Sequence, residues 1–510
     1  MKSPIGYSWL LERFALRAFR PHHTSFVDAS TRRSHDEEDG RYSVEIFPKA
    51  YLRDDTPIGH LVFALKYDGL ELGLLRRLLA ELPDELTRAV TARPTSKHLR
   101  QLWFLYEWLT GKNLEVPDVP TVKYEPVADP ERYFTLPGTR SPRHALFNNL
   151  LGTPAWSPLV RKTPRLLAYL DKRLDARARQ IRDTTDPALL LRAVRYLYTK
   201  ETKTSFAIEN AEIRGRREER FVALLQHLRG FRGFDRDMLV EVQNLIVEDP
   251  FREADYRDRQ NFIGQTIRGV ERVSYIPPRP DDVAAMMHGL EELVRQLARR
   301  PVHGLAPPIP PVVAAALVAF SFVYIHPFED GNGRLHRFLI HYILARLGFT
   351  PDDLIFPISA AILADRAGYD RVLADVDRQL MPLITYDFAD DRSILVRDND
   401  AALYAYLDLT PHAEALYRWT EQTIEVEIVQ ELDFLDKYDR ARRRMRLVLD
   451  LPDKEEDLFI TLCTGNGFRV SRTKRKSHFP TLTDEQVARL EAAVESAFQT
   501  VPPTSEDPDA

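Results

Sequence analysis

The sequence predicts a mainly α-helical protein that carries one short β-hairpin. Over most of the chain, apolar residues recur at intervals of three and four residues, which is the spacing of amphipathic helices. Residues 262–276 (FIGQTIRGVERVSYI) differ, because they are rich in β-branched residues and contain glycines near the middle. That pattern is typical of a hairpin. The chain has 510 residues, a length that allows about three domains.

Along the chain, residues 24–56 are polar and are expected to form loops. Residues 124–156 are interrupted by prolines and glycines and are expected to form a long connection. The Pro-rich, acidic end at 502–510 is expected to be disordered. Helices are predicted over 74–86, 96–109, 163–181, 187–198, 235–248, 281–299, 311–324, 334–347, 411–434 and 483–498.

Composition excludes several classes of protein. The 71 basic and 76 acidic residues give a net charge of −5, which argues against a general nucleic-acid coat. The single cysteine, Cys463, rules out a disulfide within the chain and a cysteine zinc cluster. The apolar run at 312–325 is too short to span a bilayer, and residues 1–20 lack the pattern of a signal peptide. No membrane association is expected, and a cytoplasmic location is the simplest expectation.

The segment at 326–337 (HPFEDGNGRLHR), between two predicted helices, carries a combination of residues suited to phosphate chemistry. Its glycines allow close approach of a ligand, and successive backbone N–H groups in such a turn form an anion nest. Arg334 and Arg337 lie three residues apart at the positive end of the second helix. Together these features predict a polyphosphate site that contains Gly331, Asn332, Gly333, Arg334 and Arg337.

Two further residues of this segment suggest chemistry. Asp330 would repel phosphate unless a hard cation lay between them, so a magnesium ion is expected there. His326 is a candidate general base. Each feature alone is more often structural, because Gly-Asn-Gly is also a plain turn and two arginines are often a solvated face. Their concentration within twelve residues favours the functional interpretation.

The segment matches, position by position, the motif H-P-F-x-D-G-N-G-R-x-x-R, and the chain therefore resembles the Fic family. The resemblance covers about 187–390, including 275–280 (YIPPRP), 356–359 (FPIS) and the flap hairpin at about 262–276. It implies a helical N-terminal region at 1–186, similar to that of some large bacterial members. A Fic domain at 187–392 and a helical C-terminal region at 393–510 would follow.

The resemblance implies transfer of AMP from ATP to a Ser, Thr or Tyr hydroxyl of an unidentified protein, or of this chain itself. His326 would deprotonate the hydroxyl, and Asp330 would hold Mg²⁺ or Mn²⁺. Arg334 would hold the β-phosphate and Arg337 the γ-phosphate, while the Gly-Asn-Gly turn would surround the α- and β-phosphates. The remaining implied contacts are a base contact at Tyr369 and flap contacts to the target at Gln265, Thr266 and Ile267.

An inhibitory segment is also implied. Residues 205–210 (SFAIEN) match the family pattern [S/T]-x-x-x-E-[G/N], N-terminal to the catalytic motif. Ser205 and Glu209 would share a helical face, and Asn210 would end that helix. Glu209 would pair with Arg337 and displace the γ-phosphate. The alternative is a solvated glutamate on a short amphipathic helix.

Other activities stay open at this point. Glu209 with a metal would also suit a hydrolase that removes AMP from a modified protein. A Doc-like phosphotransferase is less favoured because both Arg334 and Arg337 are present, and transfer of UMP, GMP or phosphocholine also occurs in the family. Some members dimerise, so a homodimer is compatible with the resemblance.

A nucleic-acid-binding regulator is the non-enzymatic alternative, because 442–446 and 469–476 are locally basic. These stretches lack interleaved aromatic residues, so nucleic acid is not expected as a partner. His336 and His341 are five residues apart and do not share a helical face, which argues against a metal hydrolase. No Walker-type phosphate loop is present.

Overall fold

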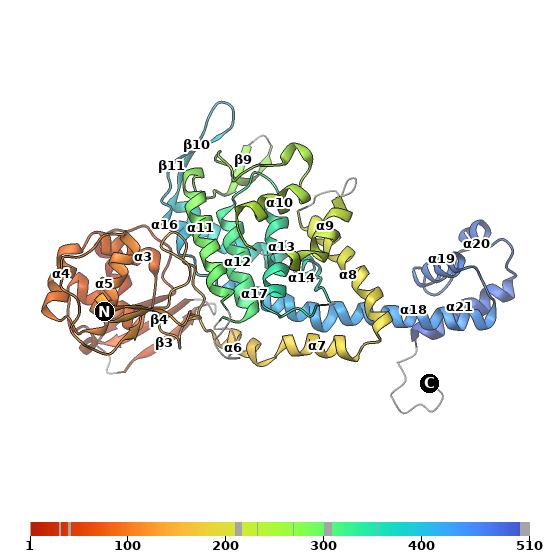
Figure 1. The fold of residues 1–510 in the computed structure, drawn as a ribbon, viewed down its shortest axis with the longest axis horizontal. Coiled ribbons are helices and arrows are strands. Elements are labelled where there is room, and N and C mark those ends of the chain that lie inside the picture. The colour runs from red at the N-terminus through yellow and green to blue at the C-terminus, as the bar shows by residue number, and fades with distance from the viewer. Residues whose placement is uncertain are drawn as a thin grey trace.

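The computed structural model describes residues 2–29, 32–38, 42–209, 217–231, 233–268, 270–299, 309–352 and 354–499. Helices dominate, as the sequence predicts. The molecule is elongated, with a mixed α/β region at the N-terminal end, a helical core in the middle and a helical extension at the C-terminal end (Figure 1). In the described part of the chain, no helix combines the length and the apolar character needed to cross a membrane.

A four-stranded sheet opens the N-terminal region. Its strand order is β1 (Ser3–Ile5), β2 (His23–Asp28), β4 (Tyr42–Pro48) and β3 (Ser34–Glu38). Strands β2 and β4 are parallel, and the other pairs are antiparallel. The expectation of loops over 24–56 is therefore wrong. Buried and less buried residues alternate along β2, but the sequence does not show a hydrophobic alternation there, because the buried positions include the polar residues His23 and Ser25.

Five helices complete the mixed region, and their buried side chains share a hydrophobic core with later residues such as Leu159 and Tyr406. They are α1 (Tyr7–Arg13), α2 (Pro57–Tyr67), α3 (Leu72–Ala80), α4 (Pro83–Ala92) and α5 (Lys97–Thr110). The helix predicted over 74–86 is divided into α3 and α4, because Pro83 is better placed in a first turn than inside a helix. The connection expected at 124–156 contains three short strands, β5 (Glu125–Pro126), β6 (Thr139–Ser141) and β7 (Leu146–Asn148).

The central core is built around α12 (Pro311–Ile325), which is apolar on all sides and almost entirely buried. Such a helix needs neighbours on every face. Its main neighbours are α13 (Asn332–Arg346), α17 (Thr410–Gln422) and α11 (Pro280–Leu297). The other helices of this region are α6 (Pro164–Asp171), α7 (Leu174–Thr184), α8 (Pro187–Ile208), α9 (Arg217–Gln226), α10 (Arg236–Ile246), α14 (Ile358–Ala364), α15 (Arg366–Leu380) and α16 (Ala402–Ala405).

Two hairpins project from one side of this core (Figure 1). The first, β8 (Ile263–Ile267) with β9 (Val270–Tyr275), is antiparallel and confirms the predicted hairpin. The second, β10 (Thr385–Phe388) with β11 (Ile394–Asp398), was not predicted. The rings of Phe262 and Phe388 lie 5.6 Å apart, so the base of the first hairpin contacts the turn end of the second.

The C-terminal extension begins with a five-residue π-helical turn (Thr423–Glu427) and the long α18 (Ile428–Val448). It continues with α19 (Asp453–Thr464), α20 (Arg472–His478) and α21 (Asp484–Gln499). Helices α19 and α21 and the residues that flank α20 share a separate small core with the end of α18. The basic run of α18 is partly neutralised, since Arg442 and Arg446 both pair with the buried carboxylate of Glu456. The tail expected to be disordered lies outside the described residues.

Short 3₁₀ turns connect several of these elements. They are Lys49–Tyr51, Pro142–His144, Leu228–Gly230, Asp249–Phe251 and Met381–Leu383.

Candidate active site

The loop between α12 and α13 is held in a sharply turned conformation. His326 closes the C-terminus of α12 in the left-handed region, with φ 51°, and its N–H donates to the carbonyl of Phe322. Two residues later Phe328 is fully buried and packs against the rings of Tyr256 and Phe322. The apolar ring of Phe328 therefore anchors the loop in the core. The polar residues on either side of it in the loop stay nearer the surface formed by α12 and α13.

Asn332 and Gly331 shape the second half of the loop. The amide of Asn332 accepts from the Phe328 N–H at 3.1 Å and donates to the Phe328 carbonyl at 2.7 Å. Gly331 precedes α13 with φ 90°, a conformation that favours glycine. The first turn of α13 therefore presents its unpaired N–H groups at the loop, as a phosphate site requires.

The two arginines of α13 converge on one carboxylate. Arg337 Nη2 lies 2.7 Å from Glu209 Oε1, and Arg334 Nε lies 2.8 Å from Glu209 Oε2. Both arginines are buried, at 1% and 3% exposure. Burial alone would lower the pKa of Arg337, but Glu209 and Tyr369 raise it above its ordinary value. Each oxygen of Glu209 thus neutralises a different buried cation.

Glu209 also covers the start of α13. A Cβ atom added at Gly333 would lie 2.3 Å from Glu209 Oε1, so only glycine leaves room for this carboxylate. Ser205, one helical turn earlier on α8, accepts from Arg337 Nε through its hydroxyl and from Arg337 Nη2 through its carbonyl. Glu209 is the first residue after α8, and Asn210 lies outside the described residues.

His326 is enclosed by polar groups from a segment that the sequence analysis did not single out. Arg257 Nε donates to the carbonyl of His326 at 2.8 Å, and the Arg257 N–H donates to the carbonyl of Pro327. Burial, followed by the charge of Arg257, lowers the pKa of His326 to about 3. The imidazole is therefore neutral at physiological pH. Its Nδ1 lies 3.3 Å from the Asn332 amide nitrogen.

Asp330 directs one oxygen into the loop. Its Oδ1 accepts from the Gly331 N–H at 2.7 Å and pairs with Arg334 Nη2 at 2.8 Å. The Asp330 side chain is 39% exposed, and these contacts do not use Oδ2. A cation could therefore reach Oδ2 from the solvent side.

Tyr369 lies beside this charge cluster. It is buried, at 5% exposure, between the rings of His336 and Trp419. Burial raises its pKa, while the charge of Arg337 and a hydrogen bond with Arg337 oppose that rise. Gln265, Thr266 and Ile267 lie on β8 of the first hairpin, where the hydroxyl of Thr266 donates to Glu271 of β9. The segment that leads into β8 does reach the loop, because the Asn261 amide lies 3.4 Å from the Phe328 carbonyl.

A buried network behind the arginines also escaped the sequence analysis. Glu201 of α8 is fully buried and accepts from Ser359 through both its N–H and its hydroxyl. It also lies 2.9 Å from His341 Nε2 of α13. No local sequence pattern identifies Glu201 as part of a buried network, because its partners are more than a hundred residues away in the chain.

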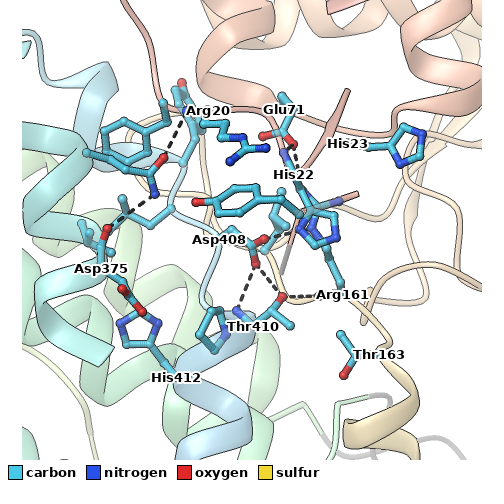
Figure 2. Close-up of a pocket in the computed structure, with 18 of the residues that line it drawn as sticks. Arg20, His22, His23, Glu71, Arg161, Thr163, Asp375, Asp408, Thr410 and His412 are labelled. Atoms are coloured by element: carbon cyan, nitrogen blue, oxygen red, sulfur yellow. Dashed lines mark hydrogen bonds and ion pairs between the residues drawn. The ribbon is translucent and has the colours of Figure 1, made fainter. Parts of the chain in front are cut away.

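A cavity of about 1150 Å³ lies elsewhere, between the N-terminal region and the core. Figure 2 shows its centre, where Arg161 lies between Glu71 and Asp408, at 2.9 Å from each carboxylate. His326, Arg334 and Arg337 do not line it. The cavity is therefore distinct from the candidate active site.

Comparison with known proteins identifies the domain that carries this geometry. Residues 233–344 match the Fic/DOC family. The match includes the loop, α13 and both arginines, and it lies within the region predicted to be a Fic domain. We conclude that the chain contains a Fic domain.

Curated relatives match the same part of the chain. Protein adenylyltransferase Fic of Drosophila mojavensis is 34% identical over 103 residues, which are 20% of this chain and 17% of the relative. The Drosophila melanogaster protein is also 34% identical over 103 residues, with 20% and 18% covered. The Nematostella vectensis protein is 31% identical over 117 residues, with 22% and 24% covered. The chain thus spans at most about a quarter of the length of these relatives.

Solved structures show weaker likeness over longer stretches. A Fic family protein from Desulfovibrio desulfuricans G20 has a TM-score of 0.36 and 19% identity, covering 56% of this chain and 80% of that one. Fic-1 from C. elegans has a TM-score of 0.33 and 16% identity, covering 74% and 94%. The sequence matches, rather than these likenesses, identify the domain.

Proposed function

We propose that this protein is an adenylyltransferase that moves AMP from ATP to a Ser, Thr or Tyr hydroxyl of a protein, and that Glu209 inhibits it. One observation carries the proposal: a carboxylate covers the first turn of α13 and pairs with both buried arginines of the loop motif. A site that attracts one anion so strongly is suited to another, the phosphate chain of ATP. The names of the matched relatives support the same activity.

In the proposed complex, the phosphates replace the Glu209 carboxylate. The N–H groups at the start of α13 and the Gly-Asn-Gly turn receive the α- and β-phosphates, and Arg334 and Arg337 hold the β- and γ-phosphates. Both arginines are already buried and aligned, so little reorganisation is needed when charge develops on pyrophosphate. This preorganisation supplies positioning and charge stabilisation, which dominate catalysis of such transfers.

His326 acts as the general base in this proposal. The target hydroxyl oxygen attacks the α-phosphorus in line, His326 accepts the hydroxyl proton, and the bond to the bridging oxygen breaks to release pyrophosphate. The low pKa of His326 keeps its imidazole neutral and thus able to accept a proton. The target segment would pair with the edge of β8 through main-chain hydrogen bonds, in register with Gln265, Thr266 and Ile267.

The residues present also fit a magnesium ion. Asp330 keeps Oδ2 out of its contacts with the loop, and one carboxylate with phosphate oxygens and waters is a usual environment for Mg²⁺. Bound there, the metal would neutralise charge on the phosphate oxygens. Mn²⁺ has a similar ligand preference.

Inhibition follows from competition between two anions for the same cations. While Glu209 pairs with Arg337, the γ-phosphate lacks its ligand, and the α-phosphorus is out of line with the attacking hydroxyl. Ser205 holds Arg337 in this arrangement through two hydrogen bonds. Removing the carboxylate should therefore increase the rate of transfer rather than merely the affinity for ATP.

Labelled ATP tests the proposal directly. We expect Glu209→Gly to increase labelling of the protein itself by more than about tenfold over wild type, and Glu209→Gly/His326→Ala to abolish it. Mass spectrometry should find AMP, rather than phosphate, on the product. Glu218→Gly is the matched control, because Glu218 follows Glu209 on the next helix and pairs with Lys203 outside the site.

Two results would contradict the proposal. Equal labelling of wild type and Glu209→Gly would exclude inhibition by Glu209. Labelling that persists in the His326→Ala background would exclude His326 as the base.

A further inference from the structure

Three metal-binding side chains meet on one face of the N-terminal sheet, far from the site described above. His23 begins β2, Glu45 lies in β4 and His35 lies in β3. In the register of the sheet, His35 is directly opposite Glu45, and His23 is opposite Ser43, two residues before Glu45. Side chains at such positions share a face. One ligand atom from each of the three side chains lies within 4.8 Å of the others.

His23 is the more buried of the two histidines. It is 9% exposed, and its Nδ1 is hydrogen-bonded to the hydroxyl of Ser43. Its Nε2 is buried, has no hydrogen-bond partner among the described residues, and lies 3.2 Å from Glu45 Oε2. In the tautomer whose Nδ1–H donates to Ser43, the lone pair of Nε2 faces the carboxylate, an arrangement that a cation between the two atoms would stabilise.

We propose that His23, His35 and Glu45 bind a Zn²⁺ ion, with a fourth position left for water or another ligand. Tetrahedral zinc with bonds of about 2.0–2.1 Å separates its ligand atoms by about 3.3 Å, close to the distance between His23 and Glu45. Two imidazoles and one carboxylate suit zinc better than they suit magnesium or calcium, which prefer oxygen ligands. His35 is exposed, and its ring lies beside that of His23, with the two centroids 6.0 Å apart.

Ser43 would act as the outer partner that fixes the orientation of the His23 ring, a common arrangement at zinc sites.

Arg33 competes for the same carboxylate. Its Nη2 lies 2.7 Å from Glu45 Oε2, and its Nε contacts the other oxygen. The Arg33 side chain is 48% exposed, so it can move into solvent when a cation of higher charge arrives. Zinc binding therefore exchanges an arginine for a divalent ion, and removal of Arg33 should strengthen binding.

The bound ion would join the edge strand β3 to the two interior strands. His23 and Ser43 also line the cavity between the N-terminal region and the core. Figure 2 shows His23 on the wall of this cavity, apart from the charged group around Arg161 and Asp408. The proposal does not depend on the proposed adenylyltransferase activity.

Zinc titration of the full-length protein tests the site. We would strip the protein with a chelator, add Zn²⁺ alone in competition with a chromophoric chelator, and use Co²⁺ absorption to report tetrahedral geometry. Wild type should bind zinc with the cobalt spectrum of a tetrahedral site. His35→Ala should weaken this binding by more than about tenfold, and Ser43→Ala by about tenfold. The control His288→Ala, a histidine 70% exposed on α11, should bind as wild type does.

Arg33→Ala is expected to change zinc binding in the opposite direction. It therefore distinguishes the loss of a zinc ligand from misfolding of the protein. It removes a surface arginine and should bind zinc more tightly than wild type. A purely structural effect of substitutions in this sheet would weaken binding in both His35→Ala and Arg33→Ala. Equal binding by wild type and His35→Ala, no tetrahedral cobalt spectrum, or weaker binding by Arg33→Ala would each overturn the proposal.

Discussion

The environment of His326 determines how the proposed reaction should depend on pH. An exposed histidine titrates near pH 6.5, and a base with that pKa would lose activity as the pH falls through it. Burial and Arg257 instead lower the pKa of His326 to about 3, so the neutral base persists at all higher pH values. The loss of activity on the acid side of the pH–rate profile should therefore occur at a lower pH than it would with an exposed histidine.

We expect kcat/KM for AMP transfer by Glu209→Gly, measured with saturating Mg²⁺, to change by less than about threefold between about pH 8 and pH 5.5. The kcat/KM profile is the appropriate measurement because it reports the free enzyme. A decline centred near pH 6.5 would contradict the assignment of His326 as a base in this buried environment.

At the residue scale, the local sequence predicted the residues of the candidate site better than the residues that hold them in place. The motif at 326–337 is contiguous, so its turn, helix start and paired arginines could be inferred together. The resemblance implied the pairing of Glu209 with Arg337, whereas its second pairing, with Arg334, was not predicted. Arg257 could not be inferred, because its role depends on where a distant loop folds back.

At the scale of elements, α8 is held to the core by the buried network of Glu201. This residue lies two helical turns before Glu209 and connects α8 to α13 through His341 and to α14 through Ser359. A helix anchored at this point keeps its C-terminal end in register with the arginines. In the proposed enzyme, Glu201 would therefore position Glu209 without touching the nucleotide.

We expect Glu201→Gln to weaken this anchor, to cost about 1–3 kcal/mol of stability, and to increase self-labelling from ATP above that of wild type. A purely structural role would lower the melting temperature without raising the labelling. Lys203→Ala, an exposed substitution on the same helix, should change neither quantity. The prediction is wrong if labelling by Glu201→Gln stays at the wild-type level.

Helices were predicted more reliably than strands, for a physical reason. Helix α12 is a long run of apolar residues that the sequence shows directly. Strand β2, in contrast, buries the polar residues His23 and Ser25 against partners from other elements. Ser25, for example, donates to the buried Asp68. The pairing of β10 with β11 likewise involves mostly exposed residues, so hydrophobic alternation could not identify it.

At the scale of the whole molecule, three distant segments meet at Arg161. Its guanidinium pairs with Glu71, the residue before α3, and with Asp408, which precedes α17. Backbone hydrogen bonds between Leu159 and both Leu407 and Leu409 run beside this pair. The charge cluster therefore fastens the N-terminal region to the core.

We expect Glu71→Ala to lower the unfolding free energy by about 2 kcal/mol, because a buried arginine loses one of its two carboxylates. Glu81→Ala, an exposed substitution at the other end of α3, should change it by less than about 0.5 kcal/mol. Denaturant midpoints of the two variants provide the comparison. Similar midpoints would show that the cluster adds nothing to the attachment of the two regions.

The attachment of Glu209 to α8 has a consequence for how the proposed inhibition is relieved. An inhibitor carried by a separate subunit is lost on dilution, whereas a group on a helix of the same chain keeps a constant effective concentration. One face of α8 belongs to the central core, so the helix cannot leave without partial unfolding. Activation should therefore be independent of protein concentration and should require only a local rearrangement at the C-terminal end of α8.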